Sequence, residues 1–168
     1  YFIRVNDDTE FMSKGFVSLG ISRLRGFDPP NLGVIGPRCS VSEGFVGNDN
    51  VLTHDMVHKT HLQIFENYYP DEFDNWWIDD WISLVYGEER TQLVNDWEVR
   101  HNMHSHGTRY AVNFTQKKYL NSVVDDGKCL IESYLKGRHR VKAETHARRV
   151  KHVRIFDGPI SRVAQLDI

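Results

Sequence analysis

Three consecutive polar residues near the start of the chain, Asn6-Asp7-Asp8, have side chains that can bind a metal ion. They directly follow an apolar, partly alternating run that predicts a β-strand. Ligands of open α/β sheets bind outside the carboxyl ends of the strands, so a metal or phosphate site is expected here. Carboxylates at such a place hold Mg²⁺ or Mn²⁺, which also bind diphosphate oxygens. The same residue types favour turns, and a simple turn is the alternative interpretation.

A tryptophan-rich segment, residues 75–86, carries a second pair of carboxylates. At ~100° per residue, its apolar side chains cover most of a helix. The remaining narrow sector holds Trp76, Asp79, Asp80 and Ser83. Burying acids is costly unless they are paired, so this face is expected to line a cleft. There, neighbouring carboxylates suit a general base, and an indole can stack on a sugar ring. A small solvent-facing stripe is the alternative.

A first histidine-rich segment has spacing that is typical of zinc ligands. In a helix, His54 and His58 lie one turn apart, and with Asp55 between them they approach the zinc-protease pattern HExxH. A zinc hydrolase would take its third ligand from His61 or His101. The Asp is shorter than the Glu of the pattern and displaces the base. Histidines on the surface of a helix are the alternative.

A second histidine-rich segment directly follows another predicted strand and begins at His101. We expect His101 to complete an octahedral metal site begun by Asp7 and Asp8, with positions left for diphosphate oxygens and water. His104 and His106 are expected to be exposed in a turn.

The elements that must position these groups alternate between helices and strands, which predicts an α/β sandwich. Gly, Pro and Asn residues mark the loops between them. The predicted helices cover residues 16–24, 53–66 and 75–86, and Gly87 ends the last of them. The predicted strands cover residues 32–35, 98–101 and 108–114, and Gly36-Pro37 closes the first of them. Residues 43–50 are predicted to form a loop that suits contact with a ligand. Segments 116–124 and 128–135 fit a helix and a strand equally well.

Composition narrows the class of protein. With 168 residues and 40% apolar side chains, the chain can bury one core. No apolar run approaches the ~20 residues that span a bilayer. Cys39 and Cys129 are far apart in the sequence, which favours two free thiols over a metal site. A disulfide between them is also possible, so the sequence does not decide between a cytoplasmic and a lumenal location. The chain begins with Tyr inside a strand-like run, so we expect a piece of a longer protein.

The net charge of −2 hides a basic C-terminal region. Residues 136–154 hold eight basic side chains and one acid, which leaves a net charge of −9 for the rest of the chain. Such a run suits contact with nucleic acid, anionic lipid or polyphosphate, but solvated helix faces have the same composition. It contains no RNA-binding aromatic motif and no helix-turn-helix, so nucleic acid is not expected as a partner.

The order of these features resembles the nucleotide-sugar-dependent glycosyltransferases of the GT-A fold. Asn6-Asp7-Asp8 resembles that family's metal-binding DxD motif, Asp79-Asp80 the acidic pair on its acceptor side, and His101 its third metal ligand. The strand at residues 33–37 and the loop at residues 44–50 match as well. Asn replaces the first Asp of DxD, Asp-Asp replaces the common Glu-Asp, and the family's nucleotide-binding N-terminal half is missing.

The resemblance covers about residues 1–115 and implies a GT-A-like mixed sheet flanked by helices, incomplete at its N-terminus, over residues 1–135. A basic extension would follow over residues 136–168. The implied activity is transfer of a sugar from a nucleotide-diphosphate donor to an acceptor hydroxyl, with inversion and with Mn²⁺ or Mg²⁺ as cofactor. The implied roles are metal binding by Asp7, Asp8 and His101; donor contact by Asn6, Asp7 and Arg109; proton abstraction by Asp79 or Asp80; and substrate contact by Trp76, Trp77, Gly47 and Asn48.

Two other functions fit parts of the same sequence. One is a zinc-dependent hydrolase that uses His54 and His58. The other is a carbohydrate-binding relative of the transferases without catalytic activity, a role that the Asn at position 6 and the missing N-terminal half would suit.

Overall fold

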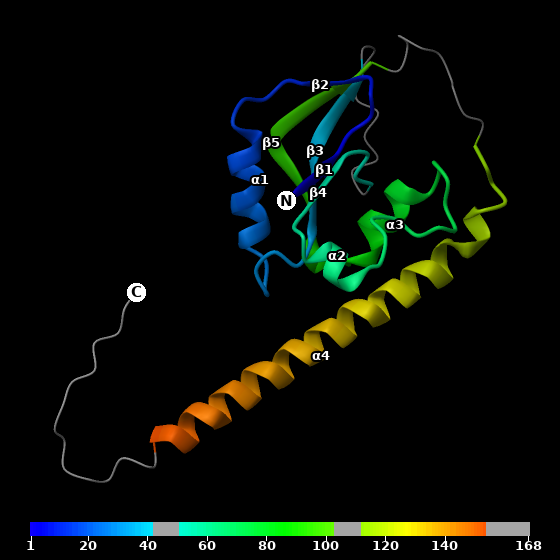
Figure 1. Cartoon of the computed structure of the whole chain (residues 1–168). Helices are drawn as coiled ribbons and strands as arrows, with labels where there is room; N and C mark the ends of the chain where they lie inside the picture. The colour runs from blue at the N-terminus through cyan, green and yellow to red at the C-terminus, as the bar shows by residue number, and fades with distance from the viewer. Residues whose placement is uncertain (42–50, 103–111, 154–168) are drawn as a thin grey trace. The chain divides into compact units, whose positions relative to one another are not determined.

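A computed structural model describes residues 1–41, 51–102 and 112–153, with side chains described as far as residue 138 (Figure 1). The chain divides into two compact units, residues 1–131 and residues 132–168. The division falls inside the last helix, close to the predicted boundary after residue 135. Unit 1 contains the sheet and every predicted site residue that the structure describes.

Unit 1 is built on a mixed sheet, which has five strands in the described part of the chain. The strands lie in the order β1-β4-β3-β5-β2; β3 and β5 pair in parallel, and the other neighbours pair antiparallel. Their bounds are β1 Phe2–Arg4, β2 Thr9–Phe11, β3 Val34–Val41, β4 Asp55–Val57 and β5 Thr91–His101. The predicted mixed α/β architecture is confirmed at this level.

The sheet is curled, because its two edge strands are neighbours in the sequence. In a flat sheet β1 and β2 would lie about 19 Å apart, four strand spacings of ~4.8 Å. Residues 5–8 join them, and even a fully extended link of that length spans at most about 18 Å. This link also contains a turn, in which Thr9 N donates to Asn6 O at 3.2 Å. The turn predicted as the alternative for Asn6-Asp7-Asp8 is therefore present.

One end of the sheet gathers the candidate residues (the upper end in Figure 1). The directions of the strands place the carboxyl ends of β1, β3 and β5 beside the amino ends of β2 and β4. In register, Arg4 of β1 lies opposite Asp55 of β4, and both Thr9 and Val41 lie opposite His101 of β5. The sheet therefore brings the turn after β1 close to the end of β5.

Helices flank the sheet (Figure 1). The bounds are α1 Phe16–Arg25, α2 His61–Ile64, α3 Ile78–Val85 and α4 Leu120–Val153, with 3-10 turns η1 Glu88–Arg90 and η3 Lys117–Tyr119. Helix α1 confirms the helix predicted over residues 16–24, and the undecided segments 116–124 and 128–135 are mostly helical. Among the described helices, none is both long and apolar enough to cross a membrane.

Helix α3 occupies the predicted segment 75–86 but begins later. The backbone of Trp77 has a φ of 73°, a left-handed conformation that cannot continue a helix toward the N-terminus. Trp76 and Trp77 therefore precede the helix, and the two carboxylates lie in its first turn. Gly87, with a φ of 70°, follows the helix and ends it as predicted.

The helix predicted over residues 53–66 is wrong. Strand β4 and the short helix α2 take its place. Asp55, Met56 and Val57 are all fully buried, and β4 pairs with β1 on one side and β3 on the other. A strand buried on both faces lacks the alternation of apolar and polar residues that distinguishes a strand from a helix.

Two predicted strands also differ from the structure. The first does not close at Gly36-Pro37, because β3 continues to Val41. A register shift between Pro37 and Arg38 accommodates a proline, which has no N–H for the ladder. In the strand predicted over residues 108–114, residues 112–114 form no strand, and the rest lies outside the described residues.

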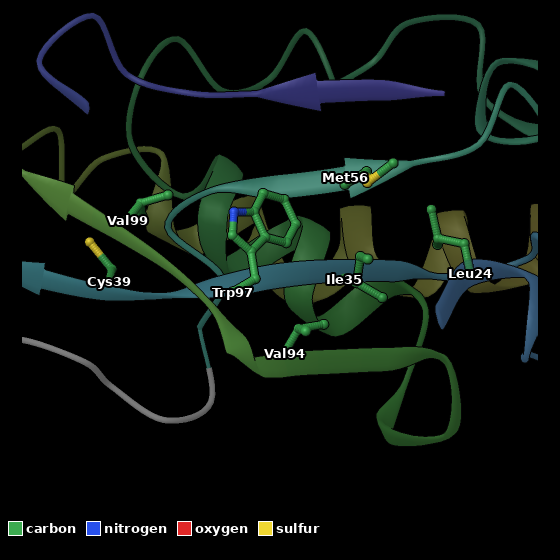
Figure 2. Close-up of a cluster of buried hydrophobic side chains, with 7 residues drawn as sticks. All are labelled: Leu24, Ile35, Cys39, Met56, Val94, Trp97 and Val99. Atoms are coloured by element: carbon green, nitrogen blue, oxygen red, sulfur yellow. The ribbon is translucent and has the colours of Figure 1, made fainter. Parts of the chain in front are cut away.

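A hydrophobic core fixes helix α1 against the sheet. Figure 2 shows the fully buried Trp97 of β5 among side chains from β3 and β4. A Cβ on Gly20 of α1 would lie 2.5 Å from Met56 Sδ, so the helix packs directly on the sheet. Close packing of this kind holds the strand ends in fixed relative positions. The buried members of this core are Leu24, Ile35, Cys39, Met56, Val94, Trp97 and Val99.

Candidate functional site

Asp8 and His101 form the most suggestive pair at this end of the sheet. The Oδ1 atom of Asp8 is buried and accepts no hydrogen bond from the described residues, although it lies 2.9 Å from His101 Nε2. Two acceptor atoms this close repel each other unless a proton or a cation lies between them. Adjacent ligands of an octahedral ion with ~2.1 Å bonds lie about 3 Å apart. The geometry of the pair therefore fits a divalent cation.

Asn6 orients the histidine of this pair. Its Oδ1 accepts a hydrogen bond from Arg4 Nη1 at 3.3 Å, so its Nδ2 is the atom that faces His101 Nε2, also at 3.3 Å. A cation bound at this ring nitrogen would use its one lone pair, so it would take the place of any hydrogen bond from the Asn6 amide.

Asp7, the other carboxylate predicted as a metal ligand, lies in the turn between β1 and β2. Its side chain is exposed at the turn. Among the side chains that the structure describes, no three His, Cys, Asp or Glu residues are grouped closely enough to hold a metal ion. The structure thus brings together Asp8 and His101 but does not group Asp7 with them.

Arg4 connects this pair to helix α3. Its Nη2 atom is ion-paired with Asp79 Oδ1, and its Nη1 donates to Asn6 and, at 2.8 Å, to the backbone oxygen of Thr53. Its Nε donates to Asp55 Oδ2 at 3.1 Å. Burial acts to lower the pKa of Arg4, but the carboxylates of Asp79 and Asp55 outweigh it and raise that pKa. The guanidinium is therefore a permanent positive charge at the centre of the site.

Asp55 is a fully buried acid whose two oxygens are both occupied. Tyr68 Oη donates to Oδ1 at 2.6 Å, and Tyr69 Oη donates to Oδ2 at 2.5 Å. Tyr69 also accepts a hydrogen bond from Arg4 Nε at 2.8 Å. Burial first, and then the charge of Asp55, raise the pKa of both tyrosines, which therefore stay protonated as donors. Such partners are what a buried carboxylate needs.

The two acids of helix α3 have different surroundings. Asp79 is one-third exposed, at 33%, and is held by Arg4. Burial raises the pKa of Asp79 to about 6; Arg4 opposes this effect, and the charges of Asp55 and Asp80 add to it. Asp80 is half-buried, and its carboxylate makes no hydrogen bond or ion pair with the described residues.

The two predicted tryptophan contacts also differ from each other. Trp77 is held on several sides: its Nε1 donates to Asn113 O at 2.8 Å, Lys117 Nζ lies 5.2 Å from its ring, and the Phe114 ring lies 6.2 Å away. Trp76 is 37% exposed and is the more open of the two. The predicted residues Gly47, Asn48, Arg109, His104 and His106 lie outside the described residues.

The histidines that suggested zinc do not form a pair. Because β4 is extended, four residues span about 13 Å there, not one helical turn. His54 is fully buried between Thr9 Oγ1, 2.7 Å from its Nε2, and Thr53 Oγ1, 3.1 Å from its Nδ1. Burial, followed by Arg4 and His101, lowers the pKa of His54 to about 4. The HExxH interpretation is wrong on this geometry.

Sequence reasoning missed the residues that join the site. Arg4 and its partner Asp79 are 75 positions apart, and Tyr68 and Tyr69 lie in a segment without a predicted role. One available signal was a cation on β1 two residues before the polar triplet.

His61 of α2 supports this network from behind. Its Nε2 lies 2.8 Å from the backbone oxygen of Tyr68, and its Nδ1 lies 2.8 Å from Tyr86 Oη. Burial is the main effect that lowers the pKa of His61 below its ordinary value of 6.5. Because the folded-state pKa lies below the unfolded one, this group favours the folded state fully above about pH 6.5, and the contribution is lost as the pH falls.

We expect His61→Gln to be less stable than the wild type by about 1–3 kcal/mol at pH 7.5, because buried partners lose their hydrogen bonds. The difference should shrink at pH 5, where the unfolded wild-type imidazole binds a proton that the folded one resists. Urea unfolding at both pH values measures this. Tyr86→Phe is the control, since it removes one partner but keeps the imidazole and its pH dependence. A stability difference that is the same at both pH values would contradict the expectation.

The arrangement at this end of the sheet is continuous. Asp8 faces His101, Asn6 contacts both His101 and Arg4, and Arg4 holds Asp79. The candidate cation site is therefore connected through Asn6 and Arg4 to the acidic first turn of helix α3. No protein-family model, no curated protein and no solved structure is significantly similar to this chain.

Proposed function

We propose that this protein is a metal-dependent glycosyltransferase with a GT-A-like fold, which moves a sugar from a nucleotide-diphosphate donor to an acceptor hydroxyl. The observation that supports this most is the connection of the two acidic motifs. The Asp8–His101 pair and the Asp79–Asp80 pair lie at the same end of the sheet and are joined through Asn6 and Arg4.

Asp8 and His101 would hold Mn²⁺ or Mg²⁺, for which a carboxylate is a preferred ligand. Bound there, the ion would offset the negative charge that builds up on the departing nucleoside diphosphate. The buried and unsatisfied Oδ1 of Asp8 supports this role, because such an atom is costly in the absence of a partner.

Asp80 is the acid that we assign as the general base. Asp79 is engaged by Arg4, whereas the Asp80 carboxylate has no protein partner among the described residues and can accept the proton of an acceptor hydroxyl. The described part of the site offers this base but no separate nucleophile beside it. That combination supports a single displacement, which inverts the configuration at the sugar carbon.

Trp76 is the residue that we assign to the acceptor. It is partly exposed and lies three and four positions before Asp79 and Asp80. An exposed indole offers an apolar face to the C–H groups of a sugar ring. Trp77, which is held by Asn113 and Lys117, would shape the wall of the same pocket.

The experiment is an assay of the protein with a panel of nucleotide sugars and simple glycoside acceptors, with Mn²⁺ or with a chelator. We expect nucleoside diphosphate release and sugar transfer from one donor, and loss of both with the chelator. Absence of nucleoside diphosphate binding in calorimetry with Mn²⁺ present would contradict the proposal. Glycan binding without transfer would favour the non-catalytic alternative, and tightly bound zinc with nucleotide-independent hydrolysis would favour a hydrolase.

A further inference from the structure

We infer that Arg4 is a positioning residue that couples the Asp8–His101 side of the site to the acidic start of helix α3. The inference rests on the proposed function for its catalytic consequence, but the coupling is a property of the contacts themselves. It assigns to Arg4 a role that the sequence motifs do not indicate, because Arg4 belongs to neither acidic pair.

The contacts of Arg4 reach five parts of the chain. Its guanidinium is bonded to the turn between β1 and β2, to Thr53 two residues before β4, to β4 itself, to the segment that follows α2 and to α3. The partners are Asn6 Oδ1 at 3.3 Å, Thr53 O at 2.8 Å, Asp55 Oδ2 at 3.1 Å, Tyr69 Oη at 2.8 Å and the ion-paired Asp79 Oδ1. One planar group therefore sets the position of Asn6 relative to Asp79.

The back of the guanidinium is locked by a buried cluster. Asp55 is fully buried, and its two oxygens accept from Tyr68 and Tyr69, so it cannot turn toward another partner. Tyr69 also places its ring 5.6 Å from the Arg4 guanidinium carbon. His61 in turn fixes the backbone of Tyr68. The Nε edge of the guanidinium is therefore held rigidly by Asp55 and Tyr69, and its Nη1 and Nη2 atoms face Asn6 and Asp79.

Only arginine has the donors that this position uses. A guanidinium presents five N–H groups in a rigid planar fork, whereas a lysine ammonium is a point charge with three rotatable donors. Lysine at position 4 would keep the charge that Asp55 requires but could not bridge Asn6 and Asp79 at the same time. Arg4→Lys therefore separates the coupling from the simple neutralisation of a buried acid.

The direct test uses the side-chain amide resonance of Asn6 in NMR spectra. In the wild type, Asp79→Asn should shift this resonance, because the change is transmitted through Arg4. In an Arg4→Lys background, the same Asp79→Asn change should leave it in place. Equal shifts in both backgrounds would overturn the coupling. This readout needs neither metal nor sugar transfer, so it decides the inference even if the proposed function fails.

The catalytic test compares Arg4→Lys with the matched change Arg23→Lys, whose arginine forms an exposed pair with Asp96 at 3.8 Å. We expect Arg4→Lys to weaken Mn²⁺ binding, measured by EPR, by about 10-fold, because Asn6, which lies beside the candidate ligand His101, loses its hydrogen bond from Arg4. We expect kcat to fall by about 10²-fold through misplacement of α3, with a smaller change in donor KM. Arg23→Lys should leave all three unchanged.

A purely structural role of Arg4 gives a different result. It would lower the melting temperature of Arg4→Lys and leave the Mn²⁺ affinity and kcat at wild-type values, and this outcome would overturn the inference. If Arg4→Lys does not fold, Tyr69→Phe removes a neutral contact to the same guanidinium, and Tyr68→Phe is its control because Tyr68 bonds Asp55 but not Arg4. Tyr69→Phe should then reduce kcat more than Tyr68→Phe, and equal reductions would count against the role.

Discussion

Asp8→Ala is expected to weaken Mn²⁺ binding by more than ~100-fold. Loss of a residue that only hydrogen-bonds to a metal ligand costs ~10–100-fold, and Asp8 would be a ligand itself. Asp8→Ala should also reduce sugar transfer on the order of 10³-fold, because the ion is expected to supply several kcal/mol of charge stabilisation in the transition state. The reason lies in one atom. Asp8 Oδ1 faces His101 Nε2 at 2.9 Å and has no hydrogen bond in the described part of the chain.

Asp8→Ala should not lower the stability of the protein, although it weakens metal binding. In the absence of metal, the Asp8 carboxylate is a buried group next to another acceptor, so its removal is expected to leave the free energy of unfolding unchanged or to increase it. Urea unfolding with a chelator measures this, and EPR titration with Mn²⁺ measures the affinity. The combination of lost affinity and unimpaired stability distinguishes a ligand from a residue that shapes a turn.

The neighbouring Asp7 provides a matched control. It has the same side chain and lies in the same turn, but it is exposed and is not grouped with His101. Asp7→Ala should therefore weaken Mn²⁺ binding much less than Asp8→Ala, and His101→Ala should resemble Asp8→Ala. Mn²⁺ affinity that survives Asp8→Ala, accompanied by a loss of stability, would assign Asn6-Asp7-Asp8 to the turn alone.

The sequence predicted the polar clusters better than the elements between them. The strand that precedes Asn6, the helix that carries Asp79 and Asp80, and the stop at Gly87 all follow from local patterns: apolar spacing, residues that favour turns, and a glycine after the last apolar position. His101 could be placed because it follows the last strand-like residues before a polar turn. These signals involve only neighbouring residues, which is why they could be used.

Strand β4 could not be predicted in this way. Thr53 is a suitable helix cap, and His54 and His58 have helical spacing, so local signals favoured a helix. What decides the structure is pairing with β1 and β3, whose residues lie about fifty and twenty positions away in the sequence. Burial on both faces also removes the alternation by which a strand is usually found.

The centre of the site was hidden for a related reason. Arg4 meets Asp55 and Asp79 across separations of 51 and 75 residues. Such contacts depend on the curl of the sheet, which brings the turn after β1 toward the end of β5. A pattern that covers one element cannot reveal a side chain whose function is to join several elements.

Asp80→Asn is expected to reduce kcat by about 10²–10⁴-fold, the usual contribution of a general base. An amide of the same shape cannot take the proton of the acceptor hydroxyl. Because the Asp80 carboxylate has no partner among the described residues, the stability of the protein should change by less than about 0.5 kcal/mol. Mn²⁺ affinity and donor KM should also remain at wild-type values. Steady-state kinetics with saturating acceptor and a thermal melt measure these quantities.

Asp79→Asn should differ from Asp80→Asn in two respects. It weakens the ion pair with Arg4 but also removes a negative charge that burial disfavours, so the two effects on stability oppose each other, and we expect a smaller fall in kcat. In the wild type, the pKa of Asp79 is raised to about 6, so its charge and its hold on Arg4 decline as the pH falls through 6. Activity should decline over the same interval, and Asp79→Asn should abolish that part of the pH profile. If Asp79→Asn instead lost more activity than Asp80→Asn, the base would be Asp79, and Arg4 would act by tuning it directly.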